Sequence, residues 1–173
     1  MPAVTRVYLV GPMGAGKTTI GKLLADELRL EFIDVDREIE SRSGVDIPWI
    51  FDREGEVGFR IRETAALKEL SQLESVLIST GGGAVLSAEN RQMMMATGTV
   101  VYLHTTVDEQ VRRTSRDRKR PLLQNDDPRR ILSELMAIRE PLYREIADIV
   151  IDTDSRSPKL VAQDLVDQLK HPH

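Results

Sequence analysis

Residues 11–18 read GPMGAGKT and fit the phosphate-binding pattern Gly-x-x-x-x-Gly-Lys-[Ser/Thr] at every fixed position. Glycines suit such a loop because backbone N–H groups must wrap around phosphates without obstruction by side chains. Lys17 can reach the β- and γ-phosphates, and the Thr18 hydroxyl can ligate the Mg²⁺ that bridges them. The alternative is a glycine-rich turn that binds nothing. The full motif instead predicts a triphosphate site formed by Gly14, Ala15, Gly16, Lys17, Thr18 and Thr19.

Two carboxylates, Asp34 and Asp36, follow an apolar run at residues 31–34. Because side chains alternate in direction along a strand, one could face Mg²⁺ and the other a substrate hydroxyl. Alternatively, Asp36 only caps the helix that follows. A kinase needs a carboxylate near both the metal and the attacking hydroxyl, which favours a functional role. The run at 76–79 ends without a carboxylate, so Asp34 is the nearest candidate for a magnesium partner.

Three successive glycines, Gly81, Gly82 and Gly83, follow the run at 76–79. Such a run costs conformational entropy, but it allows the backbone to approach a ligand closely. We therefore expect ligand contact here, with a merely flexible turn as the alternative.

The most basic segment of the chain covers residues 112–120, RRTSRDRKR. It could be a nucleic-acid patch, but it is short, has no interleaved aromatic residues and lies in an acidic chain. It could also be a solvated helix end, where cations suit the helix dipole. The third hypothesis is a mobile lid that brings arginines onto the phosphates, where charge builds up during phosphoryl transfer. Arg113 and Arg120 are the candidates for that role.

The composition narrows the class of protein. The chain has 173 residues, a formal net charge of −4 and no cysteine. This length suits one domain with a substantial core, and the missing cysteines exclude disulfides and thiolate metal sites. The charge gives no bulk attraction to nucleic acid or anionic membranes. Residues 1–5 carry no signal or transit pattern, and no apolar run reaches membrane-spanning length, so we expect a cytoplasmic monomer without nucleic-acid or membrane partners.

Strand and helix patterns alternate along the chain. Short apolar runs typical of buried strands occur at 6–10, 31–34, 76–79, 99–103 and 149–151. Helical patterns cover 37–42, 48–53, 56–73, 87–96 and 129–146, with further helices after the phosphate motif, after Thr106 and after Ser157. Gly44 and Gly55 act as breaks, and the first helix shows apolar spacing at Ile20, Leu23, Leu24 and Leu28.

This alternation predicts an α/β fold with a parallel sheet and helices on both faces. In such sheets ligands bind beyond the carboxyl ends of the strands. We therefore expect Gly11, Asp34 and Gly81, which all follow strand ends, to converge on one crevice.

The chain resembles the shikimate kinase family over essentially its whole length. The matching segments are residues 11–19, 32–36, 55–60, 80–83, 119–123 and 139–143. The resemblance implies a P-loop NTPase fold of the nucleoside-monophosphate-kinase-like type, with a five-stranded parallel sheet of order 2-3-1-4-5. It also implies transfer of the ATP γ-phosphate to the 3-hydroxyl of shikimate, in chorismate and aromatic amino-acid biosynthesis. One kinase domain, 1–173, would hold a shikimate-binding segment at about 35–63 and a lid at about 114–126.

The resemblance also assigns roles to residues. Shikimate would be held by Asp36, Arg60, Gly81, Gly82, Gly83 and Arg139, with Phe51 and Phe59 lining the apolar side of its ring. Thr18 would bind Mg²⁺ directly and Asp34 through water. Lys17, Asp34, Asp36 and Arg120 would be catalytic, Arg120 as the lid arginine at the phosphates. Arg113 and Arg156 would join the ATP site, Arg156 near the adenine.

The residue chemistry agrees independently, since a substrate carboxylate calls for arginine and vicinal hydroxyls for an acceptor such as Asp36. Without the motif match, Arg60 and Arg139 would be ordinary surface charges on helices. Two rival functions remain open. One is another small-molecule kinase of the same fold, such as a gluconate kinase, and the other is a P-loop switch or binding module without a small substrate.

Overall fold

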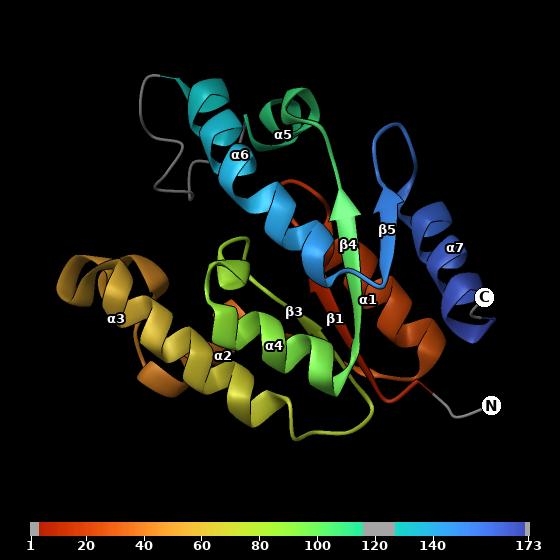
Figure 1. The fold of residues 1–173 in the computed structure, drawn as a ribbon, viewed down its shortest axis with the longest axis horizontal. Coiled ribbons are helices and arrows are strands. Elements are labelled where there is room, and N and C mark those ends of the chain that lie inside the picture. The colour runs from red at the N-terminus through yellow and green to blue at the C-terminus, as the bar shows by residue number, and fades with distance from the viewer. Residues whose placement is uncertain (1–3, 116–126, 172–173) are drawn as a thin grey trace.

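The computed structural model describes residues 4–115 and 127–171. The strands are β1 (Arg6–Val10), β2 (Glu31–Asp34), β3 (Val76–Ser79), β4 (Thr99–His104) and β5 (Ile149–Asp152). The helices are α1 (Lys17–Leu28), α2 (Val35–Ser43), α3 (Ile47–Leu70), α4 (Ala88–Thr97), α5 (Val107–Thr114), α6 (Pro128–Ile146) and α7 (Pro158–Lys170), with a short 3₁₀ turn, η1 (Ala84–Leu86). Strands and helices alternate as the sequence predicts (Figure 1).

The five strands form one parallel sheet in the order β2-β3-β1-β4-β5, which confirms the expected topology. Ser79 pairs in register with Leu9 on one side and Asp34 on the other. Thr80 continues this edge, because its N–H and hydroxyl both donate to the Leu9 carbonyl, at 3.1 and 2.8 Å. The segments that begin with Gly11, Asp34 and Thr80 therefore leave the sheet side by side, as the sequence predicts.

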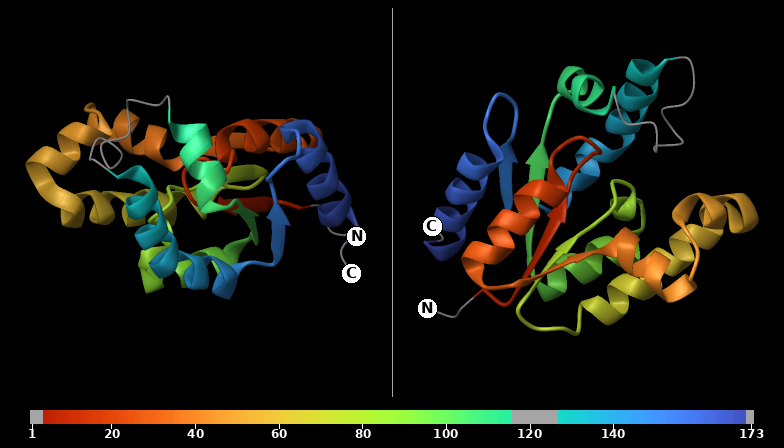
Figure 2. Two further views of the ribbon diagram at one scale, coloured as in Figure 1. Left: turned by 90° about the horizontal axis from the view of Figure 1, so that it is seen from above. Right: turned by 180° about the vertical axis from the view of Figure 1, so that it is seen from behind.

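Each face of the sheet carries its own hydrophobic core. Tyr8, Val10 and Tyr102 point into the core beneath α2, α3, α4 and α6, and Leu9 and Leu103 point into the core beneath α1 and α7. This period of two is what a strand buried on both faces requires. The ribbon seen from above has α1 and α7 on one side of the sheet and α4 and α6 on the other (Figure 2).

Polar caps fix where most helices begin. Ser87, Thr106, Asp127 and Ser157 each accept a backbone N–H of the first turn, as their sequence context predicts. Pro128 and Pro158 take the first helical position, where no N–H is needed. These caps orient α4, α5, α6 and α7 relative to the strands that they follow.

Three details of the sequence prediction are wrong. Leu23 lies on the exposed side of α1, whose buried face comprises Ile20, Gly21, Leu24 and Ala25. The helix expected at 56–73 ends earlier, at Leu70. The break expected between 48–53 and 56–73 is confirmed, because α3 consists of two helical stretches joined by a kink at Gly55, with φ 72° and ψ −178°, a conformation that L side chains rarely adopt. The third detail is the start of α2, which begins at Val35 rather than at residue 37.

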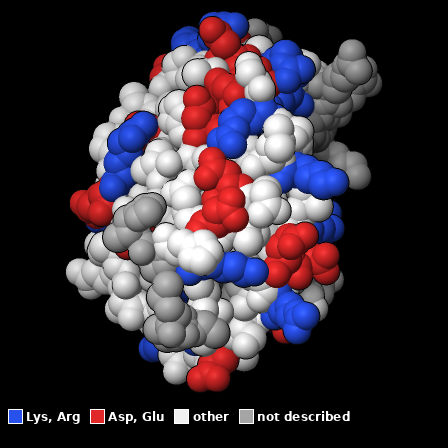
Figure 3. Space-filling model, turned by 90° about the vertical axis from the view of Figure 1, so that its right-hand side faces the viewer, with Lys and Arg blue, Asp and Glu red and all other residues white. Residues whose placement is uncertain are grey.

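No helix within residues 4–115 and 127–171 has both the length and the apolar character needed to cross a membrane. On the face that carries α7, acidic and basic side chains are interspersed rather than sorted into a basic stripe (Figure 3).

Candidate active site at the carboxyl ends of the strands

Asp34 and Asp36 occupy different kinds of position, which corrects the expectation that they alternate along a strand. Asp34 ends β2 and caps α2, because its Oδ1 accepts the N–H groups of Asp36 at 2.9 Å and Arg37 at 3.3 Å. Asp36 is therefore already in the first turn of α2 and does not serve as the cap. Since the neighbouring carboxylate does the capping, Asp36 remains available for a ligand.

Asp36 lies next to a second carboxyl group, Glu63 of α3, which is completely buried. Arg60 Nη1 donates to Glu63 Oε1 at 2.9 Å, and a carboxylate paired in this way holds the guanidinium in place. Glu63 Oε2 and Asp36 Oδ1 are buried and have no hydrogen-bond partner among the described residues. The pair thus presents two acceptor oxygens that a ligand hydroxyl could satisfy.

The electrostatics of this pair follow from burial. Burial raises the pKa of Asp36, the Asp34 charge raises it further, and Lys17 and Arg60 only partly oppose this. Burial likewise raises the pKa of Glu63, against the opposing effect of Arg60. Both carboxyl groups therefore hold a proton more strongly than an exposed carboxyl does, which is typical of functional sites.

Arg139 and Tyr143 approach the same place from α6. They are four residues apart on one helix, so they share a face, and both are buried. The Tyr143 hydroxyl donates to the Gly82 carbonyl at 2.6 Å, and Arg139 Nη1 lies beside the same glycine. Arg60 is half-buried and Arg139 is 9% exposed, so neither is the ordinary surface charge that was the alternative interpretation.

The three glycines at 81–83 make this convergence possible. A Cβ on the first would lie 3.2 Å from Asp36 Oδ1, and one on the second would lie 3.2 Å from Arg139 Nη1. On the third it would clash with the Arg60 guanidinium, closer than real Cβ atoms approach. Charged side chains therefore approach this turn closely, and the ligand contact expected at Gly81, Gly82 and Gly83 stays a prediction. Phe59, buried, and Phe51, partly exposed, add an apolar surface with ring centroids 4.8 Å apart.

The loop before α1 has the backbone that its glycines predict. Gly11, Gly14 and Gly16 have φ of 148°, 84° and 92°, and a Cβ on Gly11 would lie 2.6 Å from the Leu103 carbonyl oxygen. Lys17 does not simply face solvent. Its Nζ folds back onto the loop and donates to the carbonyl oxygens of Gly11 at 2.5 Å and Pro12 at 3.0 Å. Thr18 and Thr19 are exposed at the start of α1, and Ala15 is buried.

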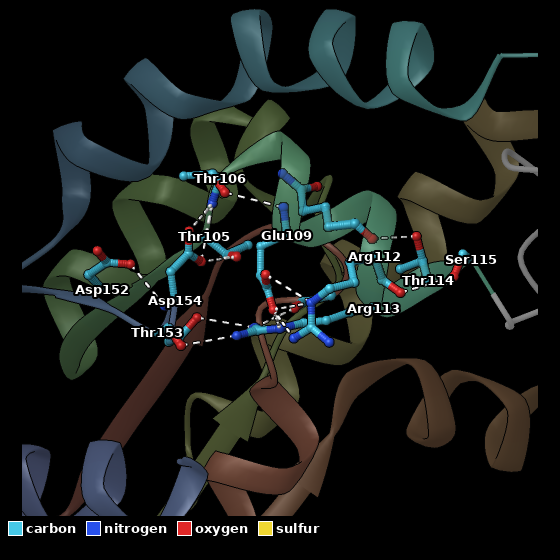
Figure 4. A network of polar contacts seen from close by, with 12 residues as sticks. Thr105, Thr106, Glu109, Arg112, Arg113, Thr114, Ser115, Asp152, Thr153 and Asp154 are labelled. Atoms are coloured by element: carbon cyan, nitrogen blue, oxygen red, sulfur yellow. Dashed lines mark hydrogen bonds and ion pairs between the residues drawn. The ribbon is translucent and has the colours of Figure 1, made fainter. Parts of the chain in front are cut away.

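Arg113 connects this loop to two other elements (Figure 4). Its Nη1 donates to the Gly14 carbonyl at 2.8 Å, its Nη2 to the Thr153 carbonyl at 3.0 Å and its Nε to Glu109 at 2.9 Å. Thr153 follows β5, and its N–H donates to His104 at the end of β4. One guanidinium therefore joins α5, the phosphate loop and the turn after β5.

A pocket of about 270 Å³ opens beside this junction. Its lining includes Ala15, Gly16, Thr19, Ile20, Arg112, Arg113, Thr153, Arg156 and Pro158. Arg156 is exposed and pairs with Asp164 of α7 at 3.2 Å. The pocket adjoins the phosphate loop, and its lining includes neither Asp36 nor Glu63.

Comparison with known proteins agrees with this site. The family model described as shikimate kinase matches residues 13–170 of the chain. A protein from Pseudomonas syringae pv. tomato named shikimate kinase is 62% identical over 163 residues, which are 94% of this chain and 95% of the relative. The chain belongs to the shikimate kinase family. A second family member, from Pseudomonas aeruginosa, is 59% identical over 96% of this chain and 97% of its own length.

Solved structures place the fold in the same family. A shikimate kinase from Acinetobacter baumannii in complex with shikimate has a TM-score of 0.93 and 49% identity, over 96% of this chain and 93% of that one. A gluconokinase from Sinorhizobium meliloti has a TM-score of 0.64 at 15% identity, a likeness that extends to the P-loop NTPase fold alone. The family therefore separates this chain from the gluconate kinase alternative, although the fold does not.

The structure brings together most of the residues predicted to form the site. Asp36, Arg60, Arg139 and the glycines 81–83 share one cluster, and Arg113 and Arg156 line the pocket that adjoins the phosphate loop. Arg120 lies outside the described residues, as does most of the predicted lid. Sequence reasoning missed Glu63, whose signal was its helical spacing of three residues from Arg60.

Proposed function

We propose that this chain transfers the γ-phosphoryl group of ATP to the 3-hydroxyl of shikimate, with the residues of the described cluster in the roles given below. The main support for this proposal is that Asp36, Arg60 and Arg139 converge around three glycines next to a phosphate-binding loop. Membership of the shikimate kinase family supplies the substrate, which the geometry of the loop alone does not define.

In this proposal the two arginines bind the shikimate carboxylate. A guanidinium offers parallel N–H donors that match a carboxylate in bidentate geometry. Arg60 is held by Glu63, so this arginine is positioned before the substrate arrives. The buried setting of the two arginines strengthens the attraction, because the surrounding dielectric is lower than that of water.

Asp36 is proposed to bind a shikimate hydroxyl, orient it for attack and accept its proton as the bond to phosphorus forms. Its Oδ1 is buried without a partner among the described residues, and its raised pKa makes it a better proton acceptor than an exposed aspartate. Lys17 is proposed to leave the loop carbonyls and stabilise the charge that develops on the transferring oxygens.

The residues present fit a magnesium ion that arrives with ATP. Asp34 uses one oxygen, Oδ1, to cap α2, which leaves Oδ2 able to accept from a metal-bound water, and the Thr18 hydroxyl is exposed at the start of α1. Within residues 4–115 and 127–171, no three His, Asp or Glu side chains cluster as a metal site of their own. Mg²⁺ commonly takes only one or two protein ligands in addition to substrate phosphates, where it offsets negative charge.

The pocket beside Arg113 is proposed to take the nucleoside of ATP, with Arg156 at its edge. Arg120 is proposed to reach the phosphates from a lid at about 114–126, and the acceptor-binding segment is proposed at about 35–63, within one domain that acts as a monomer. These assignments follow the family resemblance. They also follow from the position of Arg113, which contacts the phosphate loop from α5, shortly before the proposed lid begins.

A coupled assay of ADP release tests the proposed function. The protein is supplied with Mg²⁺ and ATP together with shikimate, with gluconate or with no acceptor. We expect turnover with shikimate alone. Turnover with gluconate would support the other small-molecule kinase, and slow ADP release that no acceptor changes would support a nucleotide-dependent switch.

A further inference from the structure

Tyr143 is a buried polar residue to which the reaction gives no role. Its side chain is completely buried, and its ring stacks on Tyr102 with centroids 4.9 Å apart. Tyr143 ends the segment 139–143, in which Arg139 is the residue proposed to bind the substrate carboxylate. A buried tyrosine hydroxyl usually has a hydrogen-bond partner, and the partner of this hydroxyl belongs to the site itself.

The Tyr143 hydroxyl connects α6 to the backbone of the glycine turn. The Gly82 carbonyl can only accept, and the hydroxyl donates to it at 2.6 Å. Arg139 is four residues earlier on the same helix, and its Nη1 lies beside the same glycine. Phenylalanine at 143 would leave the Gly82 carbonyl without this donor.

We propose that Tyr143 is a positioning residue for the acceptor substrate, which sets the distance between Arg139 and the Gly82 backbone. The inference rests on the proposed function, because it assumes that Arg139 binds the shikimate carboxylate. Gly82 lies close to both side chains: a Cβ on Gly82 would lie 3.2 Å from Arg139 Nη1 and 3.6 Å from the Tyr143 hydroxyl. The hydroxyl thus holds the turn of backbone against which Arg139 packs.

The protonation of Tyr143 supports this role. Burial raises the pKa of Tyr143, and the Arg139 charge only partly opposes the shift. The hydroxyl therefore keeps the proton that it donates to Gly82 throughout the neutral range.

The first test compares Tyr143→Phe with Tyr8→Phe. Tyr8 is also completely buried, and its hydroxyl pairs with Thr97 at 2.7 Å near the amino ends of the strands, away from the site. Tyr143→Phe should raise the KM for shikimate on the order of tenfold, the effect expected when one buried hydrogen bond is lost, with kcat and the KM for ATP nearly unchanged. Tyr8→Phe should leave the KM for shikimate unchanged, and equal KM values in both variants would overturn the inference.

Two further measurements separate positioning from a general loss of structure. If Tyr143 acts through Arg139, adding Tyr143→Phe to Arg139→Ala should change the KM for shikimate by less than about twofold. The preference for shikimate over its methyl ester, which lacks the charged carboxylate, should also fall in Tyr143→Phe. Additive effects of the two substitutions, or an unchanged preference, would show that Tyr143 does not act through this arginine.

Gly82→Ala tests the same contact from the backbone side, and it replaces Tyr143→Phe if that variant does not fold. The added methyl group should push on Arg139 and the Tyr143 hydroxyl and raise the KM for shikimate without changing the KM for ATP. The failures are distinguishable. A wild-type protein that shows no shikimate-dependent ADP release would refute the proposed function, whereas an active protein whose KM for shikimate is insensitive to both substitutions would refute only this inference.

Discussion

The acceptor side and the nucleotide side of the site are built in different ways. On the acceptor side, charged side chains from α2, α3 and α6 are buried against a turn without side chains. On the nucleotide side, backbone groups of the phosphate loop form the surface, and Thr18, Thr19 and Arg156 are exposed. The acceptor side is therefore specified by individual side chains and the nucleotide side mainly by chain conformation.

This difference has an energetic counterpart. The acceptor side holds two carboxyl groups with raised pKa values and buried oxygens without partners among the described residues, a costly arrangement before substrate binds. On the nucleotide side, the cations Arg113 and Lys17 instead donate to backbone carbonyl oxygens. Substitutions on the acceptor side should therefore affect activity and stability differently from substitutions on the nucleotide side.

The largest effect is expected on the nucleotide side, at Lys17. Lys17→Ala should lower kcat roughly a hundredfold or more, because one charge that stabilises the transferring phosphoryl group is lost. Its Nζ donates to carbonyl oxygens of the phosphate loop, and Lys17 belongs to neither hydrophobic core, so the melting temperature should change little. Steady-state kinetics and thermal unfolding check both outcomes, and near-normal turnover would contradict the nucleotide site.

Arg139→Ala should act on the other substrate. Loss of a bidentate ion pair from a buried pocket should cost about 2–4 kcal/mol, seen mainly as a higher KM for shikimate. Arg139→Lys should restore little, because lysine lacks the planar fork. Arg120→Ala is the matched comparison: it should lower kcat with a smaller effect on this KM. The same kinetic pattern in both alanine variants would show that the two arginines have been assigned wrongly.

Asp36→Asn should separate activity from stability. Since burial raises the folded pKa of Asp36 above its ordinary value of 3.8, its stabilising contribution is present below that value and is lost as pH rises through the folded pKa. At neutral pH the ionised group is therefore a cost, and Asp36→Asn should be inactive yet about 1 kcal/mol more stable. Thermal unfolding as a function of pH checks this, and the gain should vanish in acid; a destabilised variant at neutral pH would contradict it.

The smallest effect is expected at Asp154, in the turn after β5. Burial favours a higher pKa for Asp154, but hydrogen bonds from Thr105 and Thr106 outweigh it and lower the pKa. Asp154→Asn should loosen the turn that carries Thr153 and raise the KM for ATP by about threefold, without changing the KM for shikimate. Asp167→Asn, an exposed position on α7, is the control. Equal KM values for ATP in the two variants would show that this turn does not contribute to nucleotide binding.

The sequence predicts local features of this molecule well. The phosphate loop, the alternation of strands and helices and the caps at Ser87, Thr106, Asp127 and Ser157 depend on residues close together in the chain. The strand order came from the family resemblance, because periodicity identifies strands but does not arrange them. The wrong prediction for Asp36 arose two residues beyond the end of β2, where the strand has become a helix and the alternation of side chains has stopped.

What the sequence could not predict depends on contacts between distant segments. Tyr143 reaches Gly82 across 61 residues and Arg113 reaches Gly14 across 99. Neither partner is special by type, since each offers only a backbone carbonyl group. Glu63 is the intermediate case: its spacing from Arg60 was visible, but its complete burial depends on how α3 packs beside the glycines.

The glycines at 81–83 have a consequence for inhibitors that compete with shikimate. Resistance commonly requires a substitution that excludes the inhibitor but still admits the substrate. At these three positions any new side chain would displace Asp36, Arg139 or Arg60, the same groups proposed to bind the substrate. Few substitutions should therefore give resistance to a compound whose main contacts are with this stretch of backbone. Resistance to a compound that relies on the exposed Phe51 should arise more easily, by substitution of that residue.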